Sequence, residues 1–266
     1  MKKQIIIGCL LFTSCVSIDE SLIENKSYTS ISYKEPSCQI KTRETAHFLV
    51  KACDYQTADR YASLAERFYD RVMRDTGLYS FVPQKPYEIA VYKDKSEYLI
   101  SSSAKKWSGA VTLGNVILTY PSQSPESIMA HEITHLILNE FLEDYSAPFA
   151  YIAEGLAVYQ ERQASSESDL YYRNIISEKV KTSPIPFLEM SALNPVKSDK
   201  SDYISKWYAQ CSSVAEYLIK REGTFRFSIF LKNIKKGYDL DSALKDAYPG
   251  IFSDYKDLEK KWLSWL

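Results

Sequence analysis

Two histidines and a glutamate lie within five consecutive residues, His131-Glu132-Ile133-Thr134-His135, in the middle of a predicted helix. Residues four apart in a helix lie on the same face, one turn apart, so both imidazoles can face a single metal ion. Glu132, one position round the helix, can reach a water on that ion without being a ligand. This spacing suits zinc-dependent hydrolysis, in which the ion lowers the pKa of the water to about 7 and the carboxylate takes its proton.

A third ligand is needed to separate this interpretation from a surface helix with two solvated histidines, or from core histidines satisfied by hydrogen bonds. The chain has only 3 histidines, and His131 and His135 are two of them. Glu154 lies on the next predicted helix, 148–163, among apolar neighbours. Most glutamates are exposed helix carboxylates, but one in an apolar setting requires a cation. We therefore expect His131, His135 and Glu154 to bind zinc, with a fourth position open to water.

The elements that must position these residues follow an α+β order. Apolar spacing and capping residues predict strands first, with helices between them, and then helices only. Ser124 and Pro125 are expected to begin the helix that carries the histidines. We predict a small N-terminal sheet, mixed or antiparallel, followed by a mainly helical half, with the zinc cleft between them. The expected strands are 47–50, 87–92, 109–112 and 116–120, and the expected helices are 57–76, 124–141, 148–163, 171–180, 207–221, 224–236, 241–247 and 253–265.

The N-terminus has the pattern of a bacterial lipoprotein signal. Lys2 and Lys3 precede an apolar run, 5–12, that is too short to span a bilayer, and Cys15 follows it. We expect residues 1–14 to be a signal peptide, Cys15 to carry lipid, 15–45 to be a polar tether and 46–266 to be the folded domain. This places the protein in the bacterial cell envelope, anchored to a membrane and facing the periplasm or the exterior. Lipidation at Cys9 and an ordinary secretory signal are the alternatives.

Export would bring the protein into an oxidising compartment, where the remaining cysteines can form disulfides. Cys38 and Cys53 are the nearer pair, and closing that loop would stabilise the fold by roughly 3 kcal/mol in the chain-entropy model. Whether they are bonded stays open. Cys211 falls in a helical pattern and is expected to be a buried free thiol.

Composition excludes some partners. Charged residues make up 25% of the chain and the formal net charge is -1. Nucleic-acid binders carry a strongly basic balance that this chain lacks, so no nucleic acid is expected as a partner.

With these residues in view, the chain resembles the gluzincin metallopeptidases, the thermolysin-like branch of zinc peptidases. It resembles most closely the bacterial peptidase MA-like domains, in which the histidine motif is followed by an Ala-Glu-Gly-Leu-Ala helix, here 153–157. The similarity spans roughly 46–266. It implies one Zn²⁺ per chain on His131, His135 and Glu154, Glu132 as the general base, and a peptide or protein substrate.

The resemblance also suggests further roles. Tyr208 would donate to the oxyanion that forms at the attacked carbonyl. Gly109 and Ala110 would lie on the edge strand that takes an extended substrate, although a plain sheet strand is an equal alternative. Thermolysin-like enzymes often hold the first histidine with an acid four residues after the glutamate ligand, but Val158 stands there, so that partner is unidentified. His47 has no ligand-type residue spaced with it and is expected to be structural.

Two other functions stay open at this point. One is a non-catalytic surface lipoprotein that uses a peptidase-like fold to bind a partner, although a decayed site usually loses its base or a ligand first. The other is a zinc amidase acting on cell-wall material, whose reaction centre would look identical.

Overall fold

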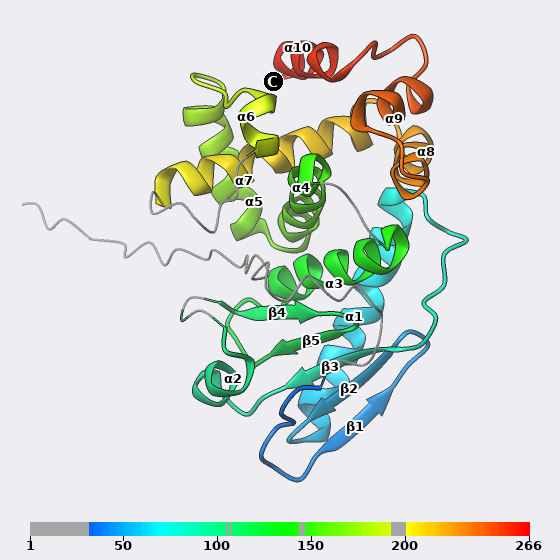
Figure 1. Ribbon diagram of the computed structural model, residues 1–266. Coiled ribbons are helices and arrows are strands. Elements are labelled where there is room, and N and C mark those ends of the chain that lie inside the picture. The colour runs from blue at the N-terminus through cyan, green and yellow to red at the C-terminus, as the bar shows by residue number, and fades with distance from the viewer. Residues whose placement is uncertain (1–31, 105, 107, 144–146, 193–200) are drawn as a thin grey trace, which may run out of the picture.

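The computed structural model describes residues 32–104, 106, 108–143, 147–192 and 201–266 (Figure 1). Within them, five strands form one mixed sheet in the order β1-β2-β3-β5-β4. The three central strands β2, β3 and β5 are parallel, and the edge strands β1 and β4 are antiparallel to their neighbours. The strand bounds are Lys41–Glu44 (β1), Phe48–Ala52 (β2), Tyr87–Val91 (β3), Ala110–Leu113 (β4) and Val116–Thr119 (β5).

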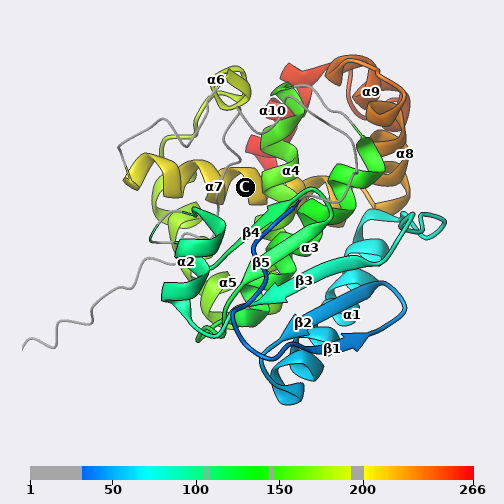
Figure 2. The same ribbon diagram turned by 60° about the horizontal axis from the view of Figure 1, so that its bottom comes forward.

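The two faces of the sheet are covered by different helices. Alternate residues such as Val50, Ile89 and Ile117 belong to the main core, together with residues of α1 (Tyr55–Thr76) and α3 (Pro125–Leu142). The opposite face packs in a smaller cluster against α2 (Lys95–Ser102). Figures 1 and 2 show α1 and α3 on the same side of the sheet, with α3 along the β4–β5 side.

Helix α1 begins and ends at residues that favour helix ends, whereas α3 does so only in part. Asp54 caps α1 by accepting a hydrogen bond from the Thr57 amide, and Gly77 ends it at a φ of 69°. Pro125 stands in the first turn of α3, but the Ser124 side chain makes no capping hydrogen bond. The start of α3 therefore depends on the proline and on packing.

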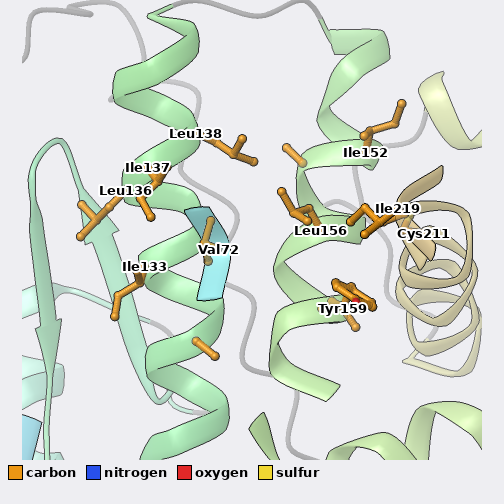
Figure 3. Close-up of a cluster of buried hydrophobic side chains, with 14 of the residues drawn as sticks. Val72, Ile133, Leu136, Ile137, Leu138, Ile152, Leu156, Tyr159, Cys211 and Ile219 are labelled. Carbon is orange, nitrogen blue, oxygen red and sulfur yellow. The ribbon is translucent and has the colours of Figure 1, made fainter. Parts of the chain in front are cut away.

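The C-terminal half is mainly helical, with α4 in its middle. Helix α4 lies between α3 on one side and α7 on the other (Figures 1 and 3). Two helices continue into π-helical turns. The bounds are Ala147–Ala164 (α4), Ser166–Ile175 (α5) with its π-turn Ile176–Val180 (η2), Phe187–Ala192 (α6), Ser201–Glu216 (α7) with its π-turn Tyr217–Arg221 (η4), Thr224–Lys235 (α8), Leu240–Ala247 (α9) and Tyr255–Trp265 (α10).

The structure confirms the α+β class, a mixed sheet followed by a mainly helical half. The sequence analysis missed three elements, β1, α2 and α6, and placed the start of α7 six residues too late. Strand β1 reads Lys-Thr-Arg-Glu and is mostly exposed, so its pairing with β2 leaves no apolar signal. Helices α2 and α6 span only 8 and 6 residues, which is too short for a clear helical period.

The described fold begins before residue 46. Residues 41–44, assigned above to the tether, form β1. A disulfide between Cys38 and Cys53 joins the segment before β1 to the end of β2. Cys211 is a buried free thiol, as expected. Cys15 and Cys9 lie outside the described residues, and among those described no helix is both long and apolar enough to cross a membrane.

Candidate metal centre

Helix α3 turns its two histidines toward α4. Its apolar residues Ile133 and Leu136 point toward the sheet, and Leu138 points from the other side of the helix toward α4 (Figure 3). His131 and His135, one turn apart on that side, bring their Nε2 atoms within 3.1 Å of each other. The His131 side chain is 1% exposed and that of His135 is 15% exposed. The helical spacing of the sequence motif is thus reproduced as a pair of converging imidazoles.

Helix α4 supplies the third group. Glu154 Oε2 lies 3.8 Å from His131 Nε2 and 3.6 Å from His135 Nε2. The next residue, Gly155, packs against α7 so closely that a Cβ there would stand 2.3 Å from the carbonyl oxygen of Cys211. Only glycine allows this approach, because a backbone carbonyl cannot move aside as the end of a side chain can. The contact between α4 and α7 therefore fixes the position from which Glu154 reaches the histidines.

The donor set and its dimensions fit a zinc ion. The ligand-type atoms of His131, His135 and Glu154 all lie within 4.8 Å of one another. A tetrahedral ion with ligands at about 2.0–2.1 Å separates adjacent donor atoms by about 3.3 Å. The observed separations of 3.1, 3.6 and 3.8 Å bracket that value. Two imidazoles and one carboxylate are also the set that leaves a tetrahedral position open in catalytic zinc sites.

Glu161 is a functional candidate that the sequence analysis did not find. Its Oε2 lies 3.3 Å from His131 Nδ1, and its side chain is only 3% exposed. A proton on Nδ1 can be donated to Glu161, which leaves the Nε2 lone pair for a metal. The partner for the first histidine is therefore present on α4, seven residues after Glu154 instead of four. Seven residues are about two helical turns, so both acids lie on one face, and this spacing is a signal the sequence does contain.

The charges around His131 favour a cation. Burial by itself lowers the pKa of His131, but the hydrogen bond to Glu161 and the charges of Glu132, Glu161 and Glu154 outweigh it and raise the pKa above its usual value. Three carboxylates around two imidazoles leave an excess of negative charge in a poorly solvated place. Such groups are stabilised by a bound proton or by a metal ion.

Glu132 stands apart from the ligand group. It is 3% exposed, and its Oε2 accepts a hydrogen bond of 2.6 Å from the Thr112 hydroxyl on β4. Burial raises the pKa of the Glu132 carboxyl, while the charges of His131 and His135 and the hydrogen bond from Thr112 oppose the shift. A carboxylate beside the candidate ligand group, held by a neighbouring hydroxyl and not part of that group, has the position required of a general base.

The remaining candidates fall on the elements that border this group. Tyr208 is 5% exposed on α7, the helix that contacts α4 beside Glu154, and its ring packs edge-on against Trp207. Ala110 begins the edge strand β4, and Gly109 directly precedes it with its carbonyl accepting a hydrogen bond from Thr119. The roles of Tyr208, Gly109 and Ala110 stay predictions.

His47 takes no part in the metal group. Its Nδ1 lies 2.7 Å from Glu66 Oε2, and its ring stacks on Tyr69 with centroids 3.9 Å apart. These contacts hold the start of β2 against α1. The expectation that His47 is structural is confirmed.

Comparison with known proteins assigns the family. A family model described as the Peptidase MA superfamily matches residues 65–266, which is more than half of the chain and includes β3, the histidine-bearing helix α3 and the whole helical half. No curated protein matches the chain. The resemblance inferred from the histidine motif and the Glu154 helix is thereby confirmed at the level of the superfamily. The chain belongs to the Peptidase MA superfamily.

Proposed function

We propose that the protein is a zinc-dependent metallopeptidase of the gluzincin type, with one Zn²⁺ held by His131, His135 and Glu154. One observation carries the proposal. Three ligand-type atoms converge within 4.8 Å, while the neighbouring Glu132 carboxylate is held separately by Thr112. A site that served only to bind metal for stability would need no additional carboxylate beside the ligands, whereas hydrolysis requires a base there.

The residues of the chain then have distinct tasks. The ion, when bound, supplies a Lewis acid that acidifies a water and polarises a carbonyl. Glu132 takes the proton of the attacking water at Oε1, the oxygen that Thr112 does not engage, and passes it to the leaving amine. Glu161 keeps the His131 proton on Nδ1. Tyr208 donates to the oxyanion, and Gly109 and Ala110 bind the backbone of an extended peptide.

The test compares metal content with turnover in the purified full-length protein. We expect one zinc per chain in the wild type, and loss of zinc in His135→Ala. Glu132→Gln should keep zinc and melting temperature and lose about 10²–10⁴-fold in cleavage of a peptide library. Full zinc content in His135→Ala would refute the ligand assignment, and unchanged cleavage in zinc-loaded Glu132→Gln would remove Glu132 from the mechanism.

The alternatives make different predictions in the same experiment. A zinc amidase would leave the peptide library intact and release fragments from purified cell-wall material, again dependent on Glu132. A non-catalytic binding protein would cleave neither substrate. The separate position of Glu132, beside the ligand group and not within it, favours an enzyme over a binding protein.

We also propose that the N-terminus is a lipid anchor on Cys15, which would hold the enzyme at a membrane of the bacterial envelope. The support is the sequence alone: Lys2 and Lys3, then the short apolar run 5–12, then cysteine. Mass spectrometry of the native protein should find an acylated N-terminus at Cys15. A mature N-terminus beyond Cys15 without lipid would leave simple secretion, and an acylated Cys9 would move the anchor upstream.

A further inference from the structure

We infer that Thr112 is a positioning residue for the proposed reaction: its hydroxyl holds the Glu132 carboxylate in the orientation from which it takes the proton of the attacking water. The inference rests on the proposed function, because it assigns a task to a neighbour of the proposed base. It concerns a residue that the histidine motif does not contain.

The contact is short and buried on both sides. The Thr112 hydroxyl lies 2.6 Å from Glu132 Oε2 and 3.3 Å from the Glu132 backbone carbonyl. Thr112 is 4% exposed and Glu132 is 3% exposed. A hydroxyl that donates to a buried carboxylate makes one of the stronger hydrogen bonds in a protein, and it limits the rotation of the carboxylate about its last bond.

Two other buried threonines use their hydroxyls differently. Thr76 donates to the Val72 carbonyl, and Thr134 donates to the Ala130 carbonyl, each within its own helix. Such bonds satisfy the hydroxyl locally and fix no other side chain. Thr112 instead connects two elements, the strand β4 and the helix α3, at the one acid proposed as the base.

Strand alternation explains why Thr112 can do this. Ala110 belongs to the main core on the side of α3, and Val111 belongs to the cluster on the side of α2. Thr112, two residues after Ala110, points to the α3 side again. Thr112 therefore places a hydroxyl at a position of β4 that faces the core, where an apolar side chain would be usual.

The hydrogen bond gives the two oxygens of the Glu132 carboxylate different roles. Oε2 is occupied by Thr112, so Oε1 is the oxygen left for the water. Strand β4 is an edge strand of the sheet, so a substrate peptide could pair with it. Thr112 lies on the same strand, and its side chain would then set the position of Glu132 relative to that peptide. Small misplacements of reacting groups cost up to about 10²-fold in rate, so loss of this constraint should appear in turnover more than in substrate binding.

The experiment uses zinc-loaded full-length protein and two pairs of variants. Thr112→Val removes the hydroxyl at nearly constant shape, and Thr112→Ser keeps it. Thr112→Ala and Thr112→Ser both lack the γ-methyl and differ in the hydroxyl alone. If the valine variant does not fold, this second pair tests the role of the hydroxyl. Thr76→Val removes a buried threonine hydroxyl whose hydrogen bonds stay within α1, and serves as the control.

Two quantities are measured at equal zinc content. We expect kcat for peptide cleavage to fall about 10- to 100-fold in Thr112→Val and Thr112→Ala, with KM nearly unchanged and with Thr112→Ser close to the wild type. The second quantity, the affinity of a peptide hydroxamate measured by calorimetry, requires no turnover. A hydroxamic acid shares its proton with a carboxylate beside the metal, so its affinity should fall about tenfold in the variants without the hydroxyl.

The outcomes separate this inference from the proposed function. A wild type that cleaves no peptide, with hydroxamate affinity that still follows the Thr112 hydroxyl, would refute the peptidase and support the positioning role. Unchanged kcat and hydroxamate affinity in Thr112→Val, or equal losses in Thr112→Ser and Thr112→Ala, would overturn the positioning role. Equal losses in Thr76→Val would do the same, because they would reflect stability alone.

Discussion

Replacement of Glu161 by glutamine tests how the metal centre is held. Glu161 Oε2 lies 3.3 Å from His131 Nδ1, and the two side chains are 3% and 1% exposed. Glutamine has nearly the same volume and keeps an oxygen that can accept the Nδ1 proton, but it carries no charge. The substitution therefore removes the electrostatic support of His131 and little else.

The expected loss is about 10- to 100-fold in zinc affinity, the usual cost of changing a partner that orients a metal-binding histidine. That corresponds to about 1.4–2.7 kcal/mol. A hydrogen bond to a charged group contributes about 1.5–3 kcal/mol, so the two magnitudes agree. Stability without metal should change little, because glutamine fills nearly the same volume and still accepts the Nδ1 proton of a neutral His131.

The assay is competition with a colorimetric chelator, together with melting curves of metal-free and zinc-loaded protein. Glu140→Gln is the matched control. Glu140 is 5% exposed on the same helix as the histidines, and its Oε1 accepts a hydrogen bond from the Gln84 amide away from the metal group. Full zinc affinity in Glu161→Gln, or an equal loss in Glu140→Gln, would refute the assigned contact.

Three further predictions follow from the described contacts. Gly155→Ala should destabilise the fold by about 1–3 kcal/mol in urea unfolding, because the added Cβ meets the Cys211 carbonyl and the clash outweighs the roughly 1 kcal/mol that alanine gains in a helix. Replacement of Cys38 and Cys53 by serine should cost about 3 kcal/mol, and a reducing agent should lower the wild-type melting temperature but not that of the double variant. Zinc affinity should fall by about tenfold per pH unit once the pH drops below the raised pKa of His131, because this imidazole must lose its proton to bind the ion, and chelator competition across a pH series should show it.

The sequence alone determined the part of the site that is local. His131, Glu132 and His135 lie on one helix, so a spacing of four residues already places the two imidazoles together. Glu154 could be added because its apolar surroundings identified an acid that is costly to bury without a cation. The order of strands and helices followed from hydrophobic period and capping residues, which also depend on near neighbours in the chain.

Only the tertiary structure decided which residues support that site. The approach of α4 to α3 brings Glu161 to His131 Nδ1, and the position of β4 beside α3 brings Thr112 to Glu132. Each contact joins segments 20 or 30 residues apart in the sequence. The spacing of Glu154 and Glu161 places both acids on one face of α4, but only the packing of α4 against α3 brings Glu161 to His131. The polar strand β1 escaped the sequence analysis for the same reason, since its stability comes from pairing with β2 and from the Cys38–Cys53 bond. Helical periodicity is a property of one segment, whereas the orientation of a buried side chain depends on whatever the fold packs against it.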